Sequence, residues 1–104
     1  MYIASIKTMK TKEEIIALLK PVFEKNKTKK AILFGSYAKG TQCEESDIDI
    51  LVDSNLHGLD FIGLIEDIQS AVGIPVDLID VYQLTNDTLI RETQLNGEII
   101  YEQP

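Results

Sequence analysis

The sequence has little cysteine, little histidine and no long apolar run, and each shortage excludes a class of protein. Cys43 is the single cysteine and His57 the single histidine, so an internal disulfide and a Cys/His zinc site are excluded. No apolar run reaches the roughly 20 residues that a membrane-spanning helix needs. The first ten residues lack the apolar centre of a signal peptide. We therefore expect a protein of the reducing cytoplasm with no membrane segment.

Basic residues are also scarce relative to acidic ones. The net charge is −7 and the isoelectric point is near 4.5. Because binding to free nucleic acid depends on neutralising phosphates, this charge disfavours a nucleic-acid groove. A nucleotide held through metal ions, or a basic protein partner, is compatible with it. With 44% hydrophobic residues in a chain of 104, we expect one globular domain, residues 1–104, and not a disordered chain.

Hydrophobic spacing predicts three helices. Thr11 and Glu14 form a capping-box pattern ahead of an apolar stripe, so a helix begins near Thr11. Pro21 lies inside this stretch, and we expect a kink or break there. Apolar residues recur at helical spacing over residues 59–72, and the glycine that follows is expected to end that helix. A last helix is predicted over residues 87–95.

Short apolar segments predict the strands. Residues 31–34 form a buried strand that ends at Gly35, residues 47–52 a second strand, and residues 76–81 a third. Residues 99–101 form an edge strand or pack loosely. A helix joins the second and third strands, so these should run parallel, whereas a short loop favours antiparallel first and second strands. The predicted fold is α/β (α+β), with a small mixed sheet of three to four strands flanked by helices.

Three aspartates are predicted to meet at one end of this sheet. Asp47 and Asp49 are two residues apart on a strand, so their side chains share a face, roughly 6–7 Å apart. Asp77 begins the third strand, and parallel pairing would place it beside them. Asp80 lies an odd number of residues from Asp77 and should face elsewhere. Carboxylates crowded together need cations, and oxygen ligands favour Mg²⁺ or Mn²⁺, two of which can clamp both oxygens of a phosphoryl displacement.

The segment after the first strand supplies candidate phosphate ligands. Gly35 lets the backbone approach a ligand closely, and Ser36 offers a hydroxyl. If residues 36–39 form a helical turn, its free N–H groups point at an anion. A triphosphate held between this turn and metal ions on the acids would satisfy both groups. Lys39 suits a phosphate contact and a solvated loop equally well.

Two motifs carry a family resemblance. The stretch LFGSYAKG at residues 33–40 is followed, after six residues, by DIDILV at residues 47–52. This resembles the DNA polymerase beta-like nucleotidyltransferases, whose pattern is Gly-Ser, about ten residues, and Asp-x-Asp. The closest subgroup is the MNT proteins, or minimal nucleotidyltransferases. Lys39 stands where members of this family often have arginine, so the charge is kept but the forked geometry is lost.

The resemblance implies a nucleotidyltransferase fold and a role for each site residue. Gly35 and Ser36 would hold the triphosphate. Asp47 and Asp49 would bind two Mg²⁺ ions. Asp77 matches the third metal-binding acid, which activates the acceptor hydroxyl.

The resemblance also implies a partner. Many MNT proteins resemble antitoxins paired with HEPN ribonuclease toxins, and they adenylylate a toxin tyrosine with ATP. For this chain it implies ATP as donor, transfer of AMP to a hydroxyl, a HEPN-type protein partner, and a homo- or hetero-oligomer. Two alternatives stay open: an antitoxin that blocks its toxin by contact alone, and a dimeric enzyme that modifies a small molecule held between its chains.

Several remaining residues have simpler interpretations. Tyr37 covers the loop rather than stacking on a base. Cys43 stands beside two glutamates, which disfavour a thiolate, and is expected to be inert. His57 belongs to a surface loop, and Arg91 lies on a solvated face of the last helix. Asp77 also fits an ordinary exposed acid at the start of a strand.

Overall fold

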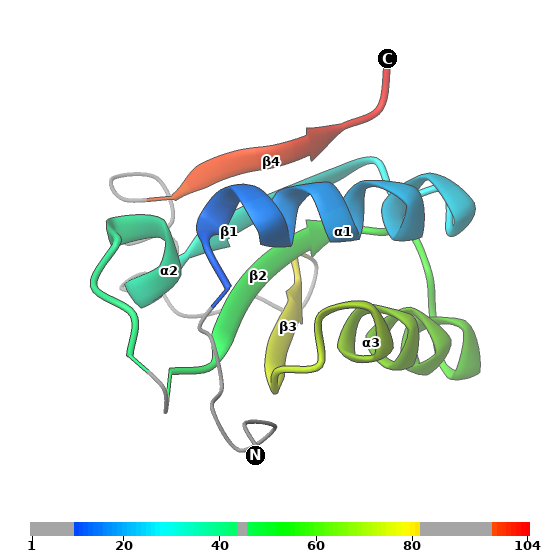
Figure 1. Cartoon of the computed structure of the whole chain (residues 1–104). Helices are drawn as coiled ribbons and strands as arrows, with labels where there is room; N and C mark the ends of the chain where they lie inside the picture. Colours follow the sequence, from blue (N-terminus) through cyan, green and yellow to red (C-terminus); the bar gives the residue numbers. More distant parts are fainter. Residues whose placement is uncertain (1–9, 44–45, 82–96) are drawn as a thin grey trace.

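The computed structural model describes residues 10–43, 46–81 and 97–104. Its elements in chain order are α1 (Lys12–Lys25), β1 (Lys30–Phe34), α2 (Gly35–Lys39), β2 (Ile48–Asp53), α3 (Leu59–Val72), β3 (Val76–Asp80) and β4 (Glu98–Glu102). The strands form a single sheet in the order β3-β2-β1-β4. Helices α1 and α3 lie side by side against one face of it (Figure 1). The predicted mixed sheet flanked by helices is confirmed, with four strands.

The sequence around α1 determines where that helix begins. The hydroxyl of Thr11 accepts a hydrogen bond from the Glu14 amide (3.1 Å), and the Glu14 carboxylate accepts one from the Thr11 amide (3.0 Å). This is the predicted capping box. The helix continues through Pro21, so the predicted break is absent. Pro21 and Ala17, whose carbonyl loses its intrahelical donor, are both exposed, so water can replace the missing bond.

The lengths of the connections set the strand directions, as predicted. Across the short α2 segment β1 and β2 run antiparallel, and across α3 the strands β2 and β3 run parallel. One boundary differs at the site: β2 begins at Ile48 rather than at Asp47. The Ile48 amide donates to the Pro75 carbonyl at 3.0 Å, which places the start of the pairing one residue later. Asp47 is therefore exposed just ahead of the strand.

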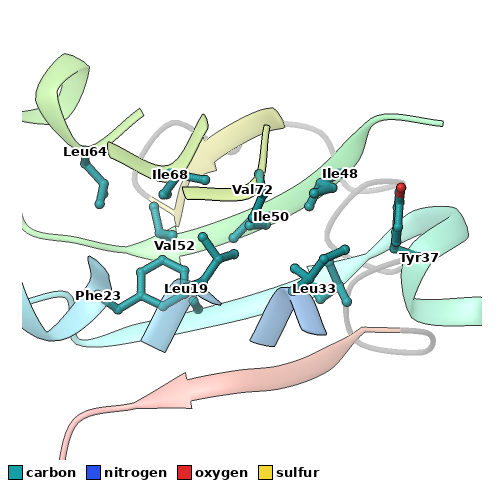
Figure 2. Packing of buried hydrophobic residues seen from close by; sticks show 12 residues of the cluster. Leu19, Phe23, Leu33, Tyr37, Ile48, Ile50, Val52, Leu64, Ile68 and Val72 are labelled. Atoms are coloured by element: carbon teal, nitrogen blue, oxygen red, sulfur yellow. The ribbon is translucent and has the colours of Figure 1, made fainter. Parts of the chain in front are cut away.

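The core lies between the sheet and the two long helices. Side chains alternate along β2, so Ile48 and Ile50 face the helices and are fully buried, and Asp49 faces the other way. Figure 2 shows the cluster from close by. Its members are Ile15, Leu19, Phe23, Ala31, Leu33, Tyr37, Ile48, Ile50, Val52, Leu64, Ile68 and Val72.

The C-terminal segment completes the sheet. Strand β4 runs antiparallel to β1, which confirms the predicted edge strand. The Tyr101 ring lies 5.5 Å from that of Phe23, and Glu98 forms an ion pair with Lys12 at 2.8 Å. Both contacts join β4 to α1. The helix predicted over residues 87–95, with Arg91, lies outside the described residues.

A membrane-spanning helix would need both length and a continuous apolar surface. Within residues 10–43, 46–81 and 97–104, no helix is both long enough and apolar enough to cross a membrane.

Gly63 offers a test of how α3 is stabilised. It lies inside α3, and a Cβ built there meets no atom within 4 Å. Gly63→Ala should therefore raise the free energy of unfolding by about 0.5–1 kcal/mol, since alanine loses less backbone entropy in a helix. Urea unfolding measures the change. Gly73→Ala is the matched control: the same space is open there, but its φ of +67° should make alanine destabilising. Equal shifts for both variants would contradict this account.

Candidate active site

Two of the three acids predicted to meet, Asp49 and Asp77, lie side by side at the start of β2 and β3. Asp49 pairs with Asp77 in the parallel register of these strands, so the two side chains share one face of the sheet. Asp77 is exposed and Asp49 is half-buried. Asp47, exposed just before β2, is close enough to influence the Asp49 carboxyl group electrostatically. The prediction that parallel pairing brings Asp77 beside Asp49 is confirmed.

Gly35 brings the phosphate-binding candidate to the same place. It begins α2 with a φ of +72°, a conformation that side chains other than glycine rarely adopt. A Cβ built at Gly35 would overlap Oδ2 of Asp49 and lie 3.2 Å from its Cγ. The Gly35 backbone is thus in direct contact with the Asp49 carboxylate. The motifs Gly-Ser and Asp-x-Asp, separated by ten residues in the sequence, therefore meet in space at Gly35 and Asp49.

The helical turn predicted after Gly35 is present as α2. Ser36 is half-buried near its first turn, and Lys39 is exposed at its last residue. The first amides of a helix have no intrahelical acceptor, so those of Gly35 and Ser36 are available to a ligand. The turn closes at Gly40, whose amide donates to the Ser36 carbonyl. Backbone donors and carboxylates therefore lie next to one another.

The electrostatic environment of Asp49 is unfavourable for a carboxylate. Burial raises the pKa of Asp49 above its ordinary value of 3.8, and the neighbouring carboxylates of Asp77 and Asp47 raise it further. Part of this burial has a visible source. Phe34, the cross-strand partner of Asp49 on β1, is only 6% exposed, and paired residues of antiparallel strands share a face. A cation at this position would relieve the repulsion.

The acids of the candidate site do not supply a complete set of ligands for a metal ion. Among the described residues, no three side chains of His, Cys, Asp or Glu lie close enough together to hold an ion. Mg²⁺ typically takes one or two carboxylates and completes its shell with phosphate oxygens and water, so the pair Asp49 and Asp77 could contribute to such a site. The candidate ligands are all carboxylate oxygens, and burial, together with the neighbouring carboxylates of Asp77 and Asp47, raises the pKa of Asp49. The residues present therefore fit a magnesium–nucleotide complex.

Other residues singled out in the sequence lie elsewhere. Asp80 is 5% exposed on the helix-facing side of β3, where it accepts a hydrogen bond from Ser54 at 2.7 Å; the prediction that it faces away from Asp77 is confirmed. His57 and Cys43 are exposed, as expected of a surface loop. Tyr37 does not cover the loop: it is 2% exposed and belongs to the core.

Phe34 lies near the site, although its sequence context predicted only a buried strand residue. It is paired with Asp49 across the two strands. The signal was present in the sequence, since a strand antiparallel to residues 47–52 and ending at Gly35 must place one of its last residues beside Asp49.

The environment of Asp49 predicts how stability depends on pH. Because the folded state raises the pKa of Asp49, ionisation of this residue lowers the free energy of unfolding. This destabilisation is absent below pH 3.8 and complete above the raised pKa. Asp49→Asn should therefore unfold a few degrees higher than wild type at neutral pH, and the difference should vanish in acid. Thermal unfolding across this pH range measures it. Glu66→Gln, at an exposed position on α3, controls for the loss of one negative charge. An equal rise in unfolding temperature for Glu66→Gln would contradict the explanation.

Comparison with known proteins agrees with this geometry. The family model described as Polymerase beta, Nucleotidyltransferase matches residues 7–104. A protein of Methanocaldococcus jannaschii named "Putative protein adenylyltransferase MJ1379" is 38% identical over 101 residues, which cover 92% of this chain and 99% of that protein.

Solved structures share the fold. A chain from the crystal structure of a toxin–antitoxin with AMP-PNP is 31% identical and has a TM-score of 0.68, over 88% of this chain and 73% of that one. A chain from the complex of a tri-AMPylated Shewanella oneidensis HEPN toxin with MNT antitoxin also has a TM-score of 0.68. It is 23% identical over 89% of this chain and 74% of that one. The extent of the family match, which leaves out only the first six residues, shows that this chain belongs to the polymerase beta family of nucleotidyltransferases.

Proposed function

We propose that this chain is a magnesium-dependent adenylyltransferase. It moves AMP from ATP to a hydroxyl of a partner protein, a tyrosine of a HEPN-type toxin, and in this way acts as an antitoxin. The observation that carries the proposal is the contact of the Gly35 backbone with the Asp49 carboxylate, beside Asp77 in register. Phosphate-binding amides and metal-binding acids can then act on one nucleotide.

The donor side of the site divides into two groups of ligands. The amides of Gly35 and Ser36, with the Ser36 hydroxyl, would hold the phosphates, because they begin a helical turn at the site. Lys39, exposed at the end of the same turn, would contribute positive charge. Asp47 and Asp49 would hold Mg²⁺, with Asp77 as a third ligand. When bound, Mg²⁺ neutralises charge on the triphosphate and on the departing pyrophosphate.

The transfer step requires a base for the acceptor. The acceptor oxygen attacks the α-phosphorus of ATP, the bond from that phosphorus to the bridging oxygen of the β-phosphate breaks, and pyrophosphate leaves. The acceptor loses its hydroxyl proton in this step, and Asp77 would accept it. Asp77 suits this role because it is exposed and lies beside Asp49, so an acceptor can reach it from outside. General-base assistance of this kind contributes about 10²–10⁴-fold in rate.

A protein is the acceptor best supported. The Methanocaldococcus jannaschii relative with 38% identity is named a putative protein adenylyltransferase. The structural relative with 31% identity comes from a toxin–antitoxin with AMP-PNP, an ATP analogue. The net charge of −7 suits a basic partner. These observations support the HEPN-type toxin that the family resemblance implies as the partner.

Label transfer tests the proposal directly. The chain is incubated with Mg²⁺, the protein product of the gene adjacent to its own, and ATP labelled at either the α- or the γ-phosphate. We expect toxin labelled from the α-position only, since AMP is transferred. Asp77→Asn should lower the rate about 10²–10⁴-fold, and Asp47→Asn with Asp49→Asn should abolish transfer. The proposal would be refuted if the partner protein became labelled from the γ-phosphate. It would also be refuted if the wild type transferred no more label than the Asp47→Asn, Asp49→Asn double variant.

The same variants separate the alternatives. A double variant that transfers no label but neutralises the toxin as well as wild type would favour an antitoxin that acts by contact alone. Nucleotide turnover with a small hydroxyl compound, and none with the protein, would favour the small-molecule enzyme. Removal of Mg²⁺ by a chelator should stop transfer and leave complex formation with the toxin intact.

Two glycines at the ends of α2 test the contact that carries the proposal. Gly35 and Gly40 have similar backbone angles, with φ of +72° and +75°, but only a Cβ at Gly35 would meet Asp49. Both alanine variants carry similar backbone strain. Gly35→Ala should therefore reduce transfer at least tenfold more than Gly40→Ala, measured as kcat/KM for ATP. Equal losses would show that backbone strain alone is responsible.

A further inference from the structure

We infer that Tyr37 is a positioning residue: it anchors α2 in the core and so sets the affinity for the donor nucleotide without touching it. The inference rests on the proposed function, because it takes the amides at the start of α2 as the phosphate-binding group. It concerns a residue that the sequence suggested only as loop cover.

Tyr37 is the point at which α2 enters the core. It is 2% exposed, whereas Ser36 and Ala38 on either side are half-buried and Lys39 is exposed. It belongs to the same buried cluster as Ile48 of β2. In Figure 2 the Tyr37 ring lies at one end of that cluster, on the side of the labelled Leu33 and Ile48.

The other contacts that attach α2 come from small residues: Ala38 packs against the same cluster, and Gly35 lies against the Asp49 carboxylate. α2 has five residues, and its N-cap, Phe34, makes no side-chain capping bond. Helices this short do not persist without tertiary packing. At the other end the Ser36 carbonyl accepts the amides of Gly40 and Thr41, the latter at 3.0 Å. These bonds close the turn on itself, but they do not attach it to the sheet.

Because Tyr37 is the one fully buried residue of α2, its packing should affect nucleotide binding. A buried ring in the middle of a one-turn helix fixes the rotation of that helix, and therefore the direction of the amides of Gly35 and Ser36. Without the ring, α2 would spend part of its time undocked, and apparent affinity falls in proportion to the docked fraction. A bound nucleotide favours the docked state. Loss of the ring should thus raise KM for ATP and leave kcat nearly unchanged.

The ring, rather than the hydroxyl, should carry this effect. Burial raises the pKa of Tyr37, with a further contribution from Cys43, so the hydroxyl stays uncharged at neutral pH. Tyr37→Phe keeps the ring and should retain wild-type nucleotide binding to within about twofold. Tyr37→Leu removes the ring and should weaken binding about tenfold, as expected if α2 is docked roughly a tenth of the time.

The experiment measures ATP binding by calorimetry, with Mg²⁺ and without partner, for wild type, Tyr37→Phe and Tyr37→Leu. The matched control is Phe23→Leu, the same loss of a ring at a position on α1 that is 1% exposed; it should lower thermal stability but bind ATP like wild type. Amide hydrogen exchange is followed in parallel. The amides of Gly40 and Thr41 should exchange faster in Tyr37→Leu, while that of Ile50 in β2 should not.

Each outcome decides the inference. A tenfold loss for Tyr37→Leu alone, with faster exchange confined to α2, would support it. Equal losses for Tyr37→Leu and Phe23→Leu, or unchanged ATP binding by Tyr37→Leu, would overturn it and leave the proposed function standing. A Tyr37→Leu protein that fails to fold while Tyr37→Phe binds poorly would overturn it as well. Wild-type protein that binds no ATP would overturn the proposed function first, and the inference with it.

Discussion

The Asp49 carboxylate lies against the Gly35 backbone on one side and in register with Asp77 on the other. Burial and the neighbouring carboxylates both disfavour its ionised form. The fold holds it there because Ile48 and Ile50, which flank it in sequence, point into the close-packed core on the opposite face of β2. The packing of that core stabilises the fold enough to offset the cost of placing the Asp49 carboxylate where its ionised form is disfavoured. The sheet itself does not need a carboxylate at this position.

One face of strand β2 thus packs into the core, and the other carries Asp49 of the candidate site. The period of two along a strand makes this division possible within a few residues. Its neighbours supply complementary parts: β3 brings Asp77 on one side, and β1 brings Phe34 and, through its end, Gly35 on the other. Because β1 and β2 are antiparallel while β2 and β3 are parallel, the end of β1 meets the starts of β2 and β3. The mixed sheet therefore brings Gly35, Asp49 and Asp77 together at one end.

Features that depend on neighbouring residues were predictable. The capping box at Thr11 and the end of α3 at Gly73 follow from local hydrogen bonding and backbone conformation. Features that depend on surroundings were not. Pro21 was expected to break α1, but its exposed position lets the helix continue. Tyr37 has a polar group and lies between glycines in a polar segment, which suggests a surface position, yet packing against β2 buries it.

The sequence by itself determined the chemical groups and their local arrangement: Gly35 with Ser36, the alternation that places Asp49 away from the core, and the connection lengths that set strand direction. Each of these depends on interactions within a few residues of the chain. Only the tertiary structure decided that Gly35 touches Asp49, that Asp77 falls opposite Asp49 rather than one residue away, and that Tyr37 is buried. Such contacts join residues far apart in sequence, so they depend on the register in which the helices and the sheet pack as a whole.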